Sequence, residues 1–121
     1  MHLLMKYFSH FDGTKKWEEI QPIVDATFHD DLIVTDGTSK YNKEEFTKRL
    51  EEFVNAGGWM EIIKLKVAPH KQGIRYEVVF HHPEDVTTPT LRTESLGRFS
   101  PENGKLISVQ RDNTRLSHQI L

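Results

Sequence analysis

The sequence contains no cysteine, which excludes disulfide bonds and thiolate chemistry. It has no excess of basic residues, because 16 lysines and arginines stand against 18 aspartates and glutamates, for a formal net charge of -2. A chain without a basic field is a poor partner for nucleic acid. No stretch approaches the roughly 20 apolar residues that cross a bilayer. These absences argue against disulfide-stabilised, nucleic-acid-binding and membrane-spanning proteins.

The apolar run at residues 1–8 is too short for a signal peptide and has no basic region before it, so we expect a cytoplasmic protein. Hydrophobic residues make up 36% of the chain and charged residues 28%, which is typical of a folded globular domain. A chain of 121 residues fits one hydrophobic core. We therefore predict a single domain over residues 1–121, with a mobile tail at 114–121.

The first part of the chain predicts helices. An apolar stripe at helical spacing marks residues 3–11. A short helix is expected over 15–21, where Pro22 should break it and begin the next turn. Asn42 followed by Glu45 forms a capping-box pattern at the start of a further helix, which Gly57 and Gly58 end.

Most of the chain after Gly57 predicts strands. Alternating residues indicate strands at 59–68, 74–82, 90–99 and 106–113, which form an antiparallel meander. Ile63 is expected on the apolar face of its strand, and Ile107 shares a face with Val109 and Arg111. A shorter strand at 32–35 leads into Asp36-Gly37, which we expect at the centre of a type I′ hairpin turn. Helices packed on one apolar sheet face make an α+β domain.

The order of these elements resembles the nuclear transport factor 2-like superfamily, with its SnoaL-like and ketosteroid-isomerase-like branch. The motifs that carry the resemblance are Phe28-His29-Asp30-Asp31, Asp36-Gly37, Asn42-x-x-Glu45-Phe46 and Gly104-Lys105-Leu106-Ile107. The resemblance implies a cystatin-like α+β fold, in which N-terminal helices pack on a strongly curved mixed or antiparallel sheet that forms a cone. It also implies a small-molecule pocket in the cone and a homodimer through the sheet. The superfamily hosts enzymes and non-enzymes, so the fold does not name a reaction.

Laid over ketosteroid isomerase, the resemblance places Asp36 at the catalytic base, and Tyr7 within about one residue of the oxyanion tyrosine. The third member of that site, a carboxylic acid, is replaced by Ser95, and the adjacent Glu94 should face the other way. Serine is a poorer hydrogen-bond donor to an enolate than a neutral carboxylic acid. This departure weakens the isomerase interpretation.

Both charged candidates have a structural alternative. Asp36 is a candidate proton acceptor if it faces an apolar pocket, but turn geometry alone suffices to select aspartate there, and the sequence favours that simpler role. Arg111 is a candidate partner for a carboxylate or an enolate oxygen. Alternatively, it pairs with Asp36 or lies past the core at the end of its strand.

Further side chains are candidates for lining a pocket for a flat apolar ligand, and the alternative is that they fill the core. These ligand-binding candidates are Trp17, Trp59, Tyr76, Phe80, Ser95 and Phe99.

The histidines do not predict a metal site. His81 and His82 are neighbours on a strand and point to opposite faces, so they cannot chelate one ion together. His29 is either a general base or a helix-end residue with a local hydrogen bond. No phosphate loop or nucleophile elbow is present, and we expect no cofactor.

The sequence leaves two functions open. The first is a small-molecule-binding protein, or a cofactor-free isomerase, cyclase or dehydratase with Asp36 as base and Tyr7 and Arg111 as oxygen partners. Its ligand would be a small, mostly apolar compound with one oxygen function. The second is a non-catalytic dimerisation or accessory module whose core is filled by its own side chains. In either case, the charged outer sheet face suggests a homodimer.

Overall fold

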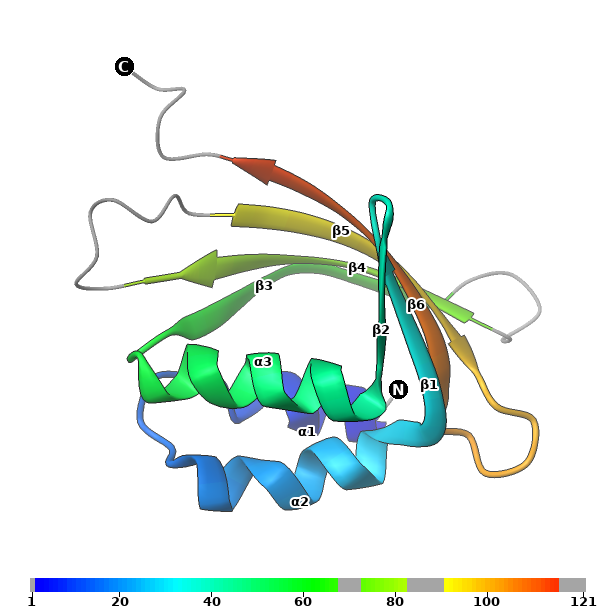
Figure 1. Cartoon of the computed structure of the whole chain (residues 1–121), viewed down its shortest axis with the longest axis horizontal. Helices are drawn as coiled ribbons and strands as arrows, with labels where there is room; N and C mark the ends of the chain where they lie inside the picture. Colours follow the sequence, from blue (N-terminus) through cyan, green and yellow to red (C-terminus); the bar gives the residue numbers. More distant parts are fainter. Residues whose placement is uncertain (1, 68–72, 83–90, 116–121) are drawn as a thin grey trace.

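The computed structural model describes residues 2–67, 73–82 and 91–115. In this part of the chain, three helices lie on one side of a six-stranded sheet (Figure 1). The α+β class predicted from the sequence is therefore confirmed. None of the described helices is long and apolar enough to cross a membrane.

The first two helices are α1, His2–Ser9, and α2, Trp17–Thr27. The predicted break at Pro22 is wrong, because α2 runs through it without interruption. Proline lacks the N–H that would donate to the carbonyl of Glu18 one turn earlier. Both residues are on the exposed side of the helix, so water can satisfy that carbonyl.

Helix α3, Lys43–Asn55, begins with the predicted capping box. The Glu45 N–H donates to Asn42 Oδ1 at 2.9 Å, and the Asn42 N–H donates to Glu45 Oε1 at 3.1 Å. Gly57 follows the end of the helix with a φ of +84°, a conformation that favours glycine. The helix buries Phe46 and Leu50 toward the sheet.

The sheet is mixed. Its strands are β1 (Phe28–Asp36), β2 (Ser39–Asn42), β3 (Trp59–Val67), β4 (Gly73–His81), β5 (Leu91–Phe99) and β6 (Leu106–Arg115). The spatial order is β2-β1-β6-β5-β4-β3, with β1 parallel to β6 and the other neighbours antiparallel. The predicted meander of β3 to β6 is thus confirmed. Strand β6 runs two residues past its predicted end, while the rest of the predicted tail, 116–121, and the predicted loop at 83–89 lie outside the described residues.

Two predicted strand faces are wrong because the pairing register shifts. Between Ile62 and Lys64 the register of β3 on β4 skips one residue, and Ile63 is 47% exposed instead of facing the helices. A second shift, between β5 and β6, puts Leu106 in the core and leaves Ile107 only half-buried. One extra residue in a strand reverses the alternation of its side chains.

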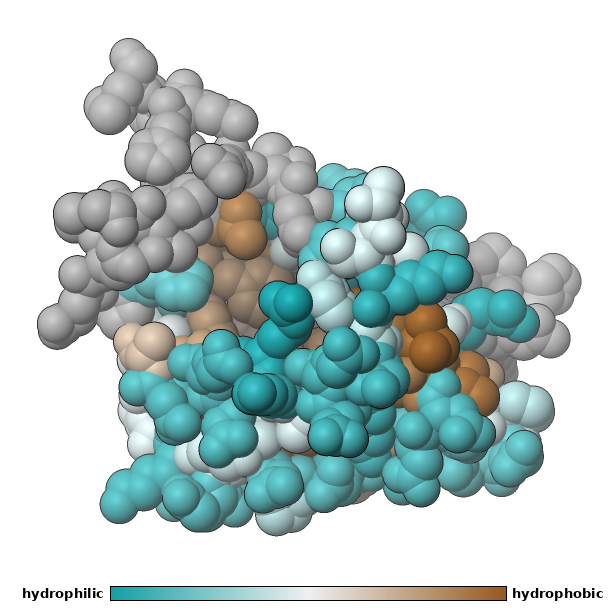
Figure 2. All heavy atoms as spheres, viewed as in Figure 1, coloured by the Kyte–Doolittle hydropathy of each residue, from teal (hydrophilic) through white to brown (hydrophobic). Residues whose placement is uncertain are grey.

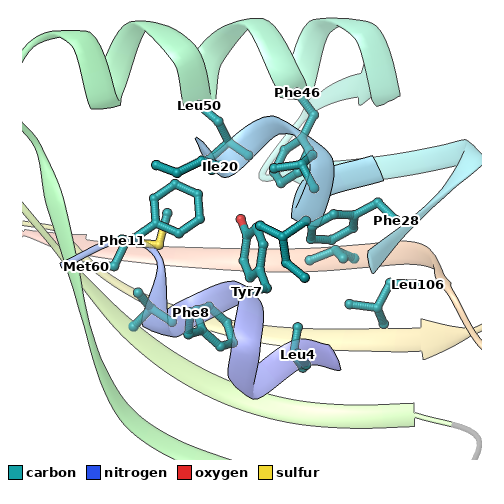
Figure 3. Packing of buried hydrophobic residues seen from close by; sticks show 14 of the residues in the cluster. Leu4, Tyr7, Phe8, Phe11, Ile20, Phe28, Phe46, Leu50, Met60 and Leu106 are labelled. Carbon is teal, nitrogen blue, oxygen red and sulfur yellow. The ribbon is translucent and has the colours of Figure 1, made fainter. Parts of the chain in front are cut away.

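Aromatic rings fill much of the space between the helices and the sheet (Figure 3). Tyr7 of α1 packs edge-on against Phe28 at 5.1 Å between ring centroids, and Phe28 packs against Phe46 at 5.0 Å. Edge-to-face pairs of this kind add about 0.5–1.5 kcal/mol beyond the area they bury. The centre of the domain is therefore a packed core, and any larger hollow must lie to one side of it.

Replacing Asn42 with alanine should lower the free energy of unfolding by about 1 kcal/mol, because the first turn of α3 loses its side-chain acceptor. Urea denaturation checks this value. The control is Glu52→Ala, on the exposed side of the same helix, which should change stability much less. Equal effects of the two substitutions would contradict a capping role for Asn42.

Candidate functional site

A row of polar side chains crosses the inner face of the sheet. Adjacent strands pair Tyr76 with Ser95, Ser95 with Arg111, and Arg111 with Asp36. One residue of the row thus comes from each of β4, β5, β6 and β1. The next row on this face is apolar. It consists of Ile74 of β4, Gly97 of β5, Val109 of β6 and Val34 of β1, which pair in that order. We call the four residues Tyr76, Ser95, Arg111 and Asp36 the polar row.

An ion pair forms the end of the polar row. Arg111 Nη2 donates to Asp36 Oδ2 at 3.1 Å, and the two side chains are only 18% and 19% exposed. Pairing of Asp36 with Ser39 makes Gly37 and Thr38 the centre of the hairpin turn, so Asp36 is the last residue of β1. The predicted turn position is therefore off by one residue. The sheet, not the turn, sets the direction of this carboxylate.

Two buried phenols lie near the guanidinium. Burial raises the pKa of Tyr76 to about 12, while the charge of Arg111 and the Ser95 hydroxyl act in the opposite direction. Burial, followed by the neighbouring Tyr76, raises the pKa of Tyr7 still further, and Arg111 again opposes the shift. The Tyr7 hydroxyl points away from α1 toward side chains of α3 (Figure 3). Both phenols remain neutral at physiological pH and can donate a hydrogen bond.

On the inner side of the sheet, two hollows adjoin the polar row. The inner hollow, of about 20 Å³, is lined by Tyr7, Tyr76 and Ser95 among others. This volume holds about one water molecule. The outer hollow, of about 280 Å³, is open to solvent, and Figure 2 shows apolar surface in the gap between α3 and strands β4 and β5. The residues that line both hollows are Phe46, Leu50, Phe80, Thr93 and Arg111. Arg111 thus lies at the boundary between a filled core and an accessible pocket.

Two buried polar atoms of the row have no hydrogen-bond partner of good geometry among the described residues. They are Arg111 Nε and Ser95 Oγ, although the Ser95 hydroxyl is close enough to Tyr76 to lower the pKa of that phenol. An unsatisfied buried donor or acceptor costs about 1–3 kcal/mol. Both residues line the inner hollow, and Arg111 also lines the outer one. The polar row therefore has unsatisfied hydrogen-bonding groups where it meets the hollows. An oxygen atom of a ligand could satisfy them.

Several predicted ligand-binding residues lie elsewhere. Trp17 is buried at the start of α2, and Phe99 is half-buried at the end of β5. Trp59 is on the face of β3 opposite to Met60, where its ring stacks on His81 with centroids 3.9 Å apart. None of these three candidates lines either hollow. Of the six ligand-binding candidates, Tyr76, Phe80 and Ser95 do.

His29 and Glu94 behave as local structural residues. His29 Nδ1 accepts a hydrogen bond from the Asp31 N–H at 2.9 Å, which is the local alternative expected from the sequence. Glu94 is exposed on the outer face, as predicted. Within the described ranges, no three histidine, aspartate or glutamate side chains gather in a way that could hold a metal ion.

Sequence reasoning missed much of the lining of the outer hollow. The missed residues are Arg49, Phe53, His82, Leu91 and Thr93. From the sequence, Arg49 is predicted to pair with Glu45 on the solvent-exposed face of its helix. In the structure its guanidinium lies 4.1 Å from the centroid of the Tyr41 ring, at the rim of the hollow. For Phe53, the sequence predicts only that it belongs to the buried face of the same helix.

No model of a known protein family matches the chain, and no curated protein matches it in sequence. Solved structures do match it in three dimensions. A protein of unknown function with a cystatin-like fold from Methylobium petroleophilum PM1 gives a TM-score of 0.76 at 12% identity, over 99% of this chain and 78% of that chain. A nuclear transport factor 2-like protein of unknown function from Cytophaga hutchinsonii gives 0.66 at 9% identity, over 93% and 87%. A steroid delta-isomerase from Pseudomonas aeruginosa gives 0.57 at 12% identity, over 84% and 76%.

These likenesses define the fold. The protein has the nuclear transport factor 2-like, cystatin-like α+β fold that its sequence predicted. At identities of 9 to 12%, these matches show a similar fold and nothing more. The isomerase activity is a property of the Pseudomonas protein. The function of this chain must be argued from its own polar row and hollows.

The ion pair can be tested by a double-mutant cycle. Asp36→Asn and Arg111→Gln each leave a mostly buried charge without its partner, so each should lower the free energy of unfolding by about 2–4 kcal/mol. The double substitution should cost less than the sum, with a coupling of about 1–3 kcal/mol. Urea denaturation of the four proteins measures this coupling.

A contrasting control is the pair of Lys43 and Asp30, in which the Lys43 side chain is 15% exposed but the Asp30 side chain is 91% exposed. The cycle of Lys43→Gln and Asp30→Asn should be close to additive, because solvent screens exposed charges. Additivity at Asp36 and Arg111 as well would show that their pairing does not stabilise the fold.

Proposed function

We propose that the protein binds one small, mostly apolar molecule with one oxygen function in the outer hollow. The observation that carries this proposal is the open hollow of about 280 Å³ between α3 and the sheet, with Arg111 among its lining residues. This is slightly below the usual 300–1,000 Å³ of drug-sized ligand pockets. The ligand is accordingly small.

The lining of this hollow suits an apolar body. Phe46, Leu50, Phe53, Phe80 and Leu91 all line it. Contact with these side chains would remove apolar ligand surface from water at about 25 cal/mol per Å². The polar end of the ligand would meet Arg111, whose Nε has no partner. A mostly apolar lining with a few polar groups is the usual composition of a small-molecule site.

Acid–base chemistry in this pocket is a finer proposal. In an isomerase, cyclase or dehydratase mechanism, Asp36 would act as base, and Tyr7 and Arg111 would bind the substrate oxygen. The ion pair opposes the first role, because the Asp36 carboxylate that would accept the proton already accepts a hydrogen bond from Arg111. Such chemistry would need the substrate to separate Asp36 from Arg111. Binding is therefore the function that the geometry supports best, and it requires no cofactor.

The alternative of a non-catalytic module with a filled core is supported by the inner hollow alone. Its volume of about 20 Å³ leaves no space for an organic ligand among the rings of the core. The outer hollow distinguishes the two proposals, because a purely structural module has no need of an open apolar pocket with a charged floor.

Fluorescence titration with the neutral dye N-phenyl-1-naphthylamine tests the binding proposal. One dye molecule per chain should bind saturably, with enhanced emission from the apolar hollow. Leu91→Trp places a larger side chain in the lining and should weaken dye binding by about tenfold, by removing volume from the pocket. The control is Ile33→Trp, because the Ile33 side chain is 44% exposed and lines neither hollow.

The control variant should bind the dye as the unmodified protein does. Absence of saturable binding, or equal affinity in the Leu91→Trp and unmodified proteins, would contradict a ligand site in the outer hollow.

We also propose that two copies associate through the outer sheet face. This face carries Lys64, Lys66 and Arg75 on β3 and β4, and Glu94 and Asp112 on β5 and β6. Lys64 and Lys66 of one copy can face Glu94 and Asp112 of another across a two-fold axis, in both directions at once. Complementary charges of this kind set partner choice and orientation.

Charge reversal tests the dimer. Lys64→Glu with Lys66→Glu, and separately Glu94→Lys with Asp112→Lys, should each shift the protein toward monomer, since both contacts then become repulsive. Mixing the two variants should restore a dimer, because both contacts become attractive again. Sedimentation velocity measures all three samples. A dimer that tolerates each reversal, or a mixture that stays monomeric, would contradict association through this face.

A further inference from the structure

The outer hollow has a local charge unlike that of the whole chain. Among the described residues, its lining contains two guanidinium groups, from Arg49 and Arg111, against the single carboxylate of Asp36. His82 also lines it and adds a further positive charge when protonated. The protein as a whole is negative, with a formal net charge of -2. The positive excess in the hollow is therefore a property of this site.

Arg111 has donor capacity that the protein does not use. Nη2 donates to Asp36, while the buried Nε has no hydrogen-bond partner. A guanidinium presents its N–H groups as a rigid fork that matches the two oxygens of a carboxylate. The contact with Asp36 shows that this guanidinium can donate to a carboxylate at this position. A ligand carboxylate can approach the same group from the open side of the hollow.

The second guanidinium lies at the rim. Arg49 projects from α3 and is held against the ring of Tyr41, with 4.1 Å from its Cζ to the ring centroid. It is exposed to solvent, in contrast to Arg111. Arg49 therefore adds positive potential at the entrance, which raises the local concentration of anions. Arg111 is the group that can make a desolvated, directional contact.

Resting on the proposed function, we infer that the ligand is a small monocarboxylate with an apolar body, and that Arg111 is the residue that selects the carboxylate. Asp36 acts as a positioning residue, since its hydrogen bond fixes the guanidinium before the ligand arrives. The apolar body lies on Phe53, Phe80 and Leu91, and the carboxylate faces Arg111. A neutral compound of equal shape binds the same apolar lining but cannot form a charge-assisted hydrogen bond between two ions with Arg111.

Competition between two isosteric compounds tests this inference. 3-Phenylpropanoate and 3-phenylpropanamide differ in the carboxylate, and each displaces bound N-phenyl-1-naphthylamine from the protein at pH 7.5 and low salt. The carboxylate should compete about tenfold more strongly than the amide, as expected for a hydrogen bond to a charged group. High salt should reduce this preference in part, through the exposed Arg49.

Arg111→Gln should abolish the preference, because it weakens competition by the carboxylate more than competition by the amide. Because this substitution removes the Arg111 guanidinium from the mostly buried Asp36 carboxylate, the double variant Asp36→Asn with Arg111→Gln provides a second test in which both charges of the ion pair are removed. It should bind the dye and treat the two compounds alike. The control is Arg98→Gln, on the outer face of β5, which should keep the full preference.

Equal competition by the two compounds in the unmodified protein would overturn the inference, as would a carboxylate preference that persists in the double variant. In both cases the dye still binds, so the proposed ligand site itself stands. Failure of the dye to bind the unmodified protein would instead contradict the proposed function, and this inference with it.

Discussion

The ion pair between Asp36 and Arg111 is the interaction on which the inner sheet face depends. A guanidinium that is 18% exposed, on a face built mostly of apolar side chains, needs a counter-ion. The parallel register of β1 with β6 supplies it, because it places the last residue of β1 directly beside Arg111. That register exists only because the first long strand of the chain lies next to the last one in the sheet. The chain topology thus determines the chemistry of the site.

The ion pair also divides the interior into two regions. On one side, aromatic rings leave only about 20 Å³ beside Tyr7, Tyr76 and Ser95. On the other, α3 and the ends of β4 and β5 leave an open hollow of about 280 Å³. Arg111 belongs to both. An apolar ligand can therefore meet a fixed positive charge without opening the core, and the protein does not have to rearrange to bind it.

The fold could be predicted from the sequence where local signals agree, as in the Asn42–Glu45 capping box and the four-stranded meander. Asp36 and Arg111 were each identified as candidates, and the structure confirms the alternative in which they pair. The sequence could not decide for it, because the pairing depends on a parallel register between segments 75 residues apart, which no local pattern encodes. The faces of Ile63 and Ile107 were mispredicted because a one-residue register shift leaves no signature in an apolar run. Arg49 was missed because a helix arginine one turn after a glutamate is typical of a solvated surface.

The most direct test of this account is a crystal structure of the protein soaked with 3-phenylpropanoate. The account predicts density in the hollow between α3 and the sheet, with the phenyl ring on Phe53 and Phe80 and a carboxylate oxygen about 3 Å from the Arg111 guanidinium. A ligand bound elsewhere, or a hollow closed by the protein's own side chains with no ligand in it, would contradict it.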